Sequence, residues 1–134
     1  MVDTKDMRPL AVRKMNEHIV ACAKEHIFIK TTCGFRTGAQ QAYDYAQGRT
    51  RLGPIITNAP QGTSMHEYGI AWDICFDKTM HPYIGDWARV AAIATSLGIE
   101  NGDSGYTDTP HHQLRCGYTD QQIIHGQVDL KKWL

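Results

Sequence analysis

The sequence predicts an α+β fold, and three observations support this prediction. The chain has 134 residues, a length that suits one hydrophobic core. Residues 7–26 and 86–97 repeat apolar side chains at helical spacing. Residues 27–33, 69–76 and 111–115 are short apolar or alternating segments, which are typical of strands.

The composition excludes several classes of protein. With 42% hydrophobic and 21% charged residues, it is that of a globular protein. Lys plus Arg and Asp plus Glu both number 14, and there is no basic stripe, so we expect no nucleic-acid partner. No apolar run is long enough to cross a bilayer, so we expect no membrane insertion. Without a repeat or linker, we expect a single domain over residues 1–134.

The N-terminus and the cysteines indicate the cellular compartment. Residues 1–6 lack the apolar core of a signal peptide, which favours synthesis in the cytoplasm. The cysteines show no Cys-x-x-Cys pairing, so a zinc ribbon or redox motif is not expected. We expect reduced, mostly buried thiols at Cys22, Cys33, Cys75 and Cys116. Cys75 shares a strand face with Asp73, but a packing role is favoured over a ligand role.

The first expected helix covers residues 7–26, with Asp6 as its N-cap and Pro9 in its first turn. Its histidines, His18 and His26, are interpreted as surface residues. Its expected buried stripe consists of Leu10, Met15, Ile19, Cys22, Ala23 and Ile27.

A strand over residues 27–33, rich in β-branched side chains, leads to a second helix. Thr37 is the expected N-cap of that helix, which covers residues 38–47. The long connection 49–62 follows, with a short strand expected at 55–57. Connections of this length are often functional.

Side chains alternate along the next strand, which begins after Gly69. Its bulky apolar row, Ile70, Trp72, Ile74 and Phe76, is expected to pack against helices, and the opposite row is Ala71, Asp73 and Cys75. The later expected elements are a turn at 78–85, a helix at 86–97, a loop at 101–107, a strand at 111–115 and a short helix at 120–125 capped by Thr119.

His66 and Asp73 form the first candidate site. They are seven residues apart, so an unbroken strand would place them on opposite faces. Gly69 permits a bend that can bring them together. The pair then offers nitrogen and oxygen ligands to a divalent metal, zinc first, and the alternative is a hydrogen-bonded structural pair.

His111 is the expected third ligand, which leaves the open fourth position of a catalytic zinc site. His112 competes for this role, but strand alternation lets one of the two face the site, and we favour His111. Pro110 disfavours helical geometry in the residue before it, so Asp108 belongs to the loop, from which it can transfer protons beside the metal. An Asx turn is an equally good interpretation of Asp108. His81 and His125 are interpreted as surface residues.

Arg36 lies between a strand and a helix in a segment with little other charge. A guanidinium there can bind a carboxylate in bidentate fashion or polarise a scissile carbonyl. The alternative is a surface salt bridge.

Several motifs, in order along the chain, carry a family resemblance. They are Gly34-Phe35-Arg36-Thr37, Gln41, Tyr45-Ala46-Gln47-Gly48-Arg49-Thr50, Thr57-Asn58-Ala59, Ser64-x-His66-x-x-Gly69-x-Ala71-x-Asp73 and Asp108-x-Pro110-His111-x-Gln113. Over roughly residues 8–126 the chain resembles the zinc-dependent peptidoglycan peptidases of the D-alanyl-D-alanine carboxypeptidase group. The L-alanyl-D-glutamate endopeptidases of bacteriophage endolysins and bacterial wall hydrolases are the most similar branch.

The resemblance implies roles for individual residues. His66, Asp73 and His111 match the ligands of one Zn²⁺ ion, and Asp108 matches the catalytic acid/base. Arg36 matches the arginine that stabilises the developing oxyanion. The positions that match substrate-binding or site-lining residues are Ser64, Gln41 and Gln113. The implied fold is a small antiparallel sheet with helices mainly on one face, as in the Hedgehog signalling domain.

The chain departs from the family pattern at two positions. Many relatives have a tryptophan at Asn101 and an aromatic residue at His112. We expect both positions near the cleft rim, where they affect substrate detail more than the metal site.

The sequence therefore predicts a zinc metallopeptidase that hydrolyses a peptide bond, L-alanyl-D-glutamate favoured, in the peptidoglycan stem peptide. We expect a monomeric phage endolysin, without a separate wall-binding module, that acts in the bacterial cell wall. One alternative is a D-alanyl-D-alanine carboxypeptidase or dipeptidase with the same zinc machinery. The other is a non-catalytic zinc-stabilised binding domain of the same fold.

Overall fold

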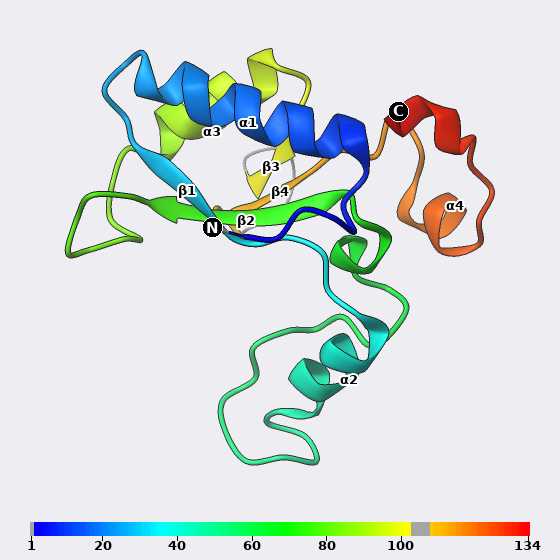
Figure 1. Ribbon diagram of the computed structural model, residues 1–134. Coiled ribbons are helices and arrows are strands. Elements are labelled where there is room, and N and C mark those ends of the chain that lie inside the picture. The colour runs from blue at the N-terminus through cyan, green and yellow to red at the C-terminus, as the bar shows by residue number, and fades with distance from the viewer. Residues whose placement is uncertain (1, 103–107) are drawn as a thin grey trace.

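The computed structural model describes residues 2–102 and 108–134. Within this part, four strands form one antiparallel sheet (Figure 1) in the order β1-β2-β4-β3. Their bounds are β1 Ile29–Cys33, β2 Ala71–Phe76, β3 Glu100–Asn101 and β4 His111–Gln113. The central strand β2 pairs with β1 on one side and with β4 on the other, so segments far apart in sequence meet on it.

Two helices, α1 (Pro9–Ala23) and α3 (Trp87–Ser96), lie on the same side of the sheet (Figure 1). The core lies between them and the sheet, and it includes Trp72 and Ile74 of β2, which are fully buried as the alternation predicts. The prediction of an α+β fold with helices mainly on one face of a small antiparallel sheet is confirmed.

The helix α2 (Gly38–Ala46) and the connection after it project from the other side of the sheet (Figure 1). Thr37 caps α2 as predicted, since its hydroxyl accepts from Gln40 N at 3.1 Å. Thr119 caps α4 (Asp120–Ile124) in the same way. Two short 3₁₀ helices complete the described elements, η1 (Met65–Tyr68) and η3 (Leu130–Trp133). No described helix combines the length and apolarity needed to cross a membrane.

Three predictions about elements are wrong. Arg8, not Asp6, is the N-cap of α1, and its side chain makes no capping hydrogen bond. Residues 55–57 form no strand, because Ile55 and Ile56 are each 56% exposed and have no neighbouring strand to pair with. Asn101, expected in a loop, belongs to β3, where it pairs with His112. Residues 103–107 of that expected loop lie outside the described residues.

Two placements of polar residues are also wrong. His18 is fully buried rather than on the surface, because it lies one turn from both Met15 and Cys22 on the buried stripe of α1. Its Nε2 atom lies 2.9 Å from the backbone oxygen of Val90. Asn101 and His112, expected at the cleft rim, are each 1% exposed. His112 packs in the core against His18 and Trp72.

Candidate metal centre and active-site cleft

The turn between η1 and β2 brings the first two predicted ligands together. Ser64 caps η1, and the carboxylate of Glu67 accepts from the backbone nitrogens of Ser64 and Gly62. Gly69 then ends η1 with a φ of 73°, a left-handed conformation that glycine adopts without strain. The chain reverses there, so the predicted bend at Gly69 is present.

Asp73 lies at the centre of the candidate site. Its Oδ1 atom is 3.4 Å from His66 Nε2 and 3.5 Å from His111 Nδ1. His111 reaches this position because it is the direct partner of Asp73 in the β2–β4 register. Asp73 Oδ1 is buried and accepts no well-formed hydrogen bond from the described residues. A buried carboxylate oxygen that faces two imidazole nitrogens is the donor set of a divalent metal, so these residues fit the predicted zinc ion.

Cys33, expected from the sequence only as a reduced, mostly buried thiol, is a further candidate ligand. It pairs with Asp73 across the β1–β2 register, and its sulfur lies 3.9 Å from His66 Nδ1 and 3.3 Å from Arg36 Nη2. Two sets of described side chains have ligand atoms within 4.8 Å of one another: Cys33, His66 and Asp73, and Asp73, Asp108 and His111. The predicted ligands His66, Asp73 and His111 are divided between these two sets, with Asp73 in both.

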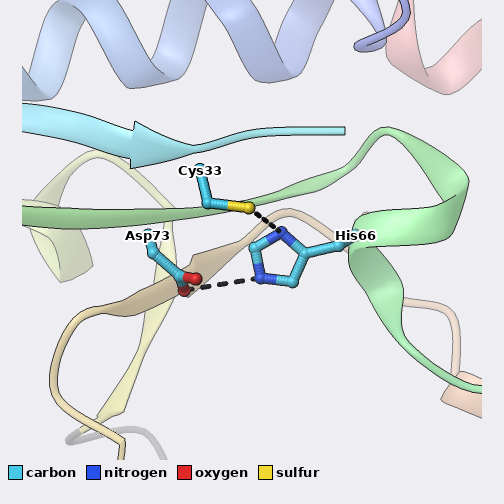
Figure 2. Close-up of side chains that lie close together, drawn as sticks. All are labelled: Cys33, His66 and Asp73. Atoms are coloured by element: carbon cyan, nitrogen blue, oxygen red, sulfur yellow. Dashed lines mark hydrogen bonds and ion pairs between the residues drawn. The ribbon is translucent and has the colours of Figure 1, made fainter. Parts of the chain in front are cut away.

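The orientation of His66 favours Asp73 over Cys33 as its partner in metal binding. Figure 2 shows Cys33 beside Nδ1 of the ring and Asp73 beside Nε2. The Nδ1 atom lies 2.8 Å from the backbone oxygen of Gly34, to which an Nδ1–H group donates. When the ring is neutral, as in a metal ligand, its lone pair is then on Nε2, which faces Asp73.

Charge interactions shift the pKa values of the site. Burial alone would raise the pKa of Asp73, but the imidazoles of His111 and His66 outweigh it and hold this pKa well below its usual range. Burial opposes the charged form of His66, but its contacts with Asp73, Cys33 and Gly34 together raise its pKa to about 9. The pKa of Asp108 is raised by burial and by the neighbouring charge of Asp73.

Arg36 extends from the segment after β1 toward the same centre. Its Nη1 atom donates to Gln41 Oε1 at 2.8 Å, and its Nη2 atom lies 3.9 Å from Asp73 Oδ2. Gln41 is fully buried behind Arg36, and its amide nitrogen donates to the backbone oxygen of Ala59 at 2.7 Å. Gln41 therefore contacts Arg36 and the long connection at Ala59. A direct contact of Gln41 with substrate stays a prediction.

A cleft of about 290 Å³ opens over these side chains. The predicted site residues that line it are Arg36, Ser64, His66, Asp73, Asp108, His111 and Gln113. The long connection contributes Ile56, Thr57 and Ala59 to the lining, and Thr63 follows directly after it. The structure thus gathers seven of the eight predicted site residues, from segments spread over most of the chain, around one cavity.

The comparison with curated proteins identifies the family. The chain is 32% identical to the peptidoglycan L-alanyl-D-glutamate endopeptidase CwlK of Bacillus subtilis (strain 168), over an alignment of 124 residues that covers 81% of this chain and 74% of CwlK. The chain belongs to this family of peptidoglycan peptidases. No family model matches the sequence.

Solved structures show the same fold for this peptidase. VanYB in complex with D-alanine-D-alanine matches with a TM-score of 0.61 at 16% identity, covering 92% of this chain and 79% of that one. A VanY D,D-pentapeptidase in complex with Zn(II) matches with a TM-score of 0.60 at 16% identity, covering 92% and 80%. The L-Ala D-Glu endopeptidase ChiX of Serratia marcescens matches with a TM-score of 0.51 at 18% identity, covering 83% and 82%.

Proposed function

We propose that this peptidase hydrolyses the L-alanyl-D-glutamate bond of the peptidoglycan stem peptide with one zinc ion held by His66, Asp73 and His111. The observation that carries the proposal is the position of Asp73 between the two imidazoles, at 3.4 and 3.5 Å. The identity to CwlK supports the choice of bond. The Zn(II)-bound VanY neighbour supports the choice of metal.

The side chains divide the chemistry between them. Zinc, when bound, supplies a Lewis acid and lowers the pKa of a coordinated water to about 7. The raised pKa of Asp108 suits a carboxylate that accepts a proton from the attacking water and then donates it to the departing amine. Arg36, held by Gln41, is placed to stabilise negative charge that develops on the carbonyl oxygen.

Substituting Asp108 with alanine tests the assignment of the acid/base. We expect Asp108→Ala to retain zinc, because His66, Asp73 and His111 are unchanged, and to clear cell walls at least about 100-fold more slowly. The measurements are metal analysis and the turbidity of purified walls. Asp77→Ala, at the end of β2 away from the cleft lining, is the matched control and should clear walls like wild type. Undiminished clearing by Asp108→Ala would refute the role.

Mass spectrometry of the digested walls tests the bond. Cleavage of L-alanyl-D-glutamate leaves L-alanine on the glycan and releases peptides that begin with D-glutamate. The alternative, a D-alanyl-D-alanine carboxypeptidase or dipeptidase, has support from the VanYB neighbour bound to D-alanine-D-alanine. Release of free D-alanine or of its dipeptide would establish that alternative instead.

The biological setting in this proposal is that of a monomeric phage endolysin that acts in the cell wall. Its support is the resemblance of the motifs around Arg36, His66 and His111 to phage enzymes of this branch. Expression of the chain together with a membrane-permeabilising phage protein should lyse a bacterial host. Survival of that host, with active enzyme present in its cytoplasm, would contradict the endolysin role.

A further inference from the structure

Gln113 holds the metal-site histidine His111 by a side-chain contact. At His18, His66 and His112 a ring nitrogen lies within 2.9 Å of a backbone oxygen. At His111 the Nε2 atom lies 2.8 Å from the side-chain oxygen of Gln113. A side-chain partner, unlike a backbone carbonyl, can be changed by substitution, so the importance of this contact can be measured.

The contact determines which nitrogen of His111 can bind a metal. A histidine ligand is neutral, with a lone pair on the metal-facing nitrogen and a proton on the other. The Nδ1 atom of His111 faces Asp73 at 3.5 Å, so the proton belongs on Nε2 and needs an acceptor. The amide oxygen of Gln113 is that acceptor, and an outer partner of this kind orients the ring and fixes its tautomer.

The sheet holds Gln113 in place for this role. In the β2–β4 register, Gln113 is paired with Ala71 and His111 is paired with Asp73, so both side chains emerge on the same face of β4. Alanine is small, which leaves room for the glutamine side chain beside it. Gln113 is 4% exposed, so bulk water has little access to replace its oxygen.

We propose that Gln113 is a positioning residue that keeps His111 in the Nε2–H tautomer required for zinc binding through Nδ1. The inference rests on the proposed zinc function, and it assigns Gln113 a role other than substrate contact. The two roles differ in what they change: loss of a positioning residue weakens zinc binding, whereas loss of a substrate contact raises KM at unchanged zinc affinity.

Three substitutions separate these possibilities. Gln113→Glu keeps an acceptor at this position and cannot donate. Gln113→Leu and Gln113→Met remove the acceptor with little change in volume. Gln127→Leu is the matched control, because Gln127 is exposed and outside the cleft lining.

The first measurement is zinc affinity, by competition with a chromophoric chelator. Loss of an outer-shell partner typically costs 10- to 100-fold in metal affinity, so we expect Gln113→Leu and Gln113→Met to bind zinc about 10- to 100-fold more weakly. Gln113→Glu should bind zinc at least as tightly as wild type, and Gln127→Leu should equal wild type. Circular dichroism of the metal-free variants shows whether they are folded.

The second measurement is independent of any variant. In zinc-loaded wild type, long-range ¹H–¹⁵N correlation spectra should show the His111 proton on Nε2. A proton on Nδ1, or wild-type zinc affinity in folded Gln113→Leu, would overturn the inference. Neither result depends on catalysis: a wild type that binds zinc but leaves walls intact would contradict the proposed function and leave the role of Gln113 standing.

Discussion

At the scale of single residues, the site depends on one carboxylate between two imidazoles. Asp73 keeps its negative charge because His66 and His111 lie within 3.5 Å of it. The contacts of His66 with Asp73, Cys33 and Gly34 together raise its pKa to about 9 in the metal-free protein. We therefore expect His66 to be protonated at neutral pH in the metal-free protein, and zinc binding through Nε2 to require the loss of that proton.

Zinc binding should accordingly release a proton and depend on pH. We expect release of about one proton per zinc at pH 7 and a loss of affinity of roughly tenfold per unit as the pH falls below about 9. Calorimetric titrations in buffers with different ionisation enthalpies give the proton count. Equal zinc affinity at pH 6.5 and pH 8.5 would contradict the prediction.

Zinc affinity should rise with pH, whereas the folding stability of the metal-free protein should fall as the pH rises. A histidine whose pKa is raised on folding stabilises the fold fully below its unfolded pKa, about 6.5, and this stabilisation is lost as the pH rises through about 9. Zinc is thus expected to replace a proton as the partner of Asp73.

Some residues of the candidate site could be predicted from their spacing in the sequence, and others could not. His66, Asp73 and His111 were predicted as ligands from strand alternation, the bend that Gly69 permits and the family resemblance, but the approach of His111 to Asp73 also requires the pairing of β4 with β2. The approach of Cys33 was not predicted, because it depends on the register between β1 and β2, which is set by pairing across 40 residues of sequence. His18 was predictable from its spacing to Met15 and Cys22, but its polarity suggested the surface.

At the scale of elements, the turn at Gly69 connects the capped helix η1 to the strand that carries Asp73. A Cβ atom at this position would lie 2.6 Å from the backbone oxygen of Asp6, which cannot move aside as a side chain can. The turn therefore requires glycine both for its positive φ and for the close approach of the N-terminal segment.

Replacing Gly69 with alanine should separate these two requirements when Gly117→Ala serves as the control. Gly117 also has a positive φ, of 86°, but a Cβ there meets no atom within 4 Å. We expect Gly117→Ala to reduce the free energy of unfolding by about 1 kcal/mol, and Gly69→Ala to cost clearly more. Urea denaturation measures both values, and equal losses would show that the contact with Asp6 does not matter.

Element types were predicted better than their boundaries and pairing. Capping residues with a hydroxyl, Thr37 and Thr119, located two helix starts. The start of α1 was missed because Arg8 caps it without a side-chain hydrogen bond. Residues 55–57 have strand-forming side chains, but strand propensity requires a partner, and the connection has none there.

At the scale of the whole molecule, the strand order places three candidate metal ligands in a row across the sheet. Cys33, Asp73 and His111 are successive partners on β1, β2 and β4. The helices α1 and α3 lie on one side of the sheet, and the side chains of Asp73 and His111 line the cleft on the other. The sequence predicted the fold class and which side chains of β2 face the helices. The position of β4 between β2 and β3 depends on long-range pairing that no local pattern encodes.

The buried histidine of β4 should make the whole fold sensitive to acid. Burial lowers the pKa of His112 to about 4, whereas an unfolded histidine titrates near 6.5. Between these values the unfolded state binds more protons, so the free energy of unfolding falls as the pH drops from about 6.5 to 4. The expected loss from this residue is about 3 kcal/mol.

The test compares metal-free wild type with His112→Phe, which keeps an aromatic ring in the core. Urea denaturation between pH 7 and pH 4 should show that the free energy of unfolding falls less steeply with decreasing pH in His112→Phe than in wild type. His125→Phe, a substitution of an exposed histidine, should leave the slope unchanged. If the free energy of unfolding of His112→Phe fell as steeply with pH as that of wild type, the acid sensitivity would belong to other groups.

The buried amide of Gln41 joins Arg36 to Ala59, and the carboxylate of Glu67 fastens Gly62 and Ser64. The loop that lines the cleft is thus anchored near its end, next to the candidate metal site. Residues 49–56 lie upstream of these anchors. They are held to α2 by contacts of their own, from Gln47 to Pro54 and from Arg51 to Tyr43. Replacing the exposed side chain of Ile56, which lines the cleft, is therefore expected to alter which stem peptides are accepted while the loop keeps its shape.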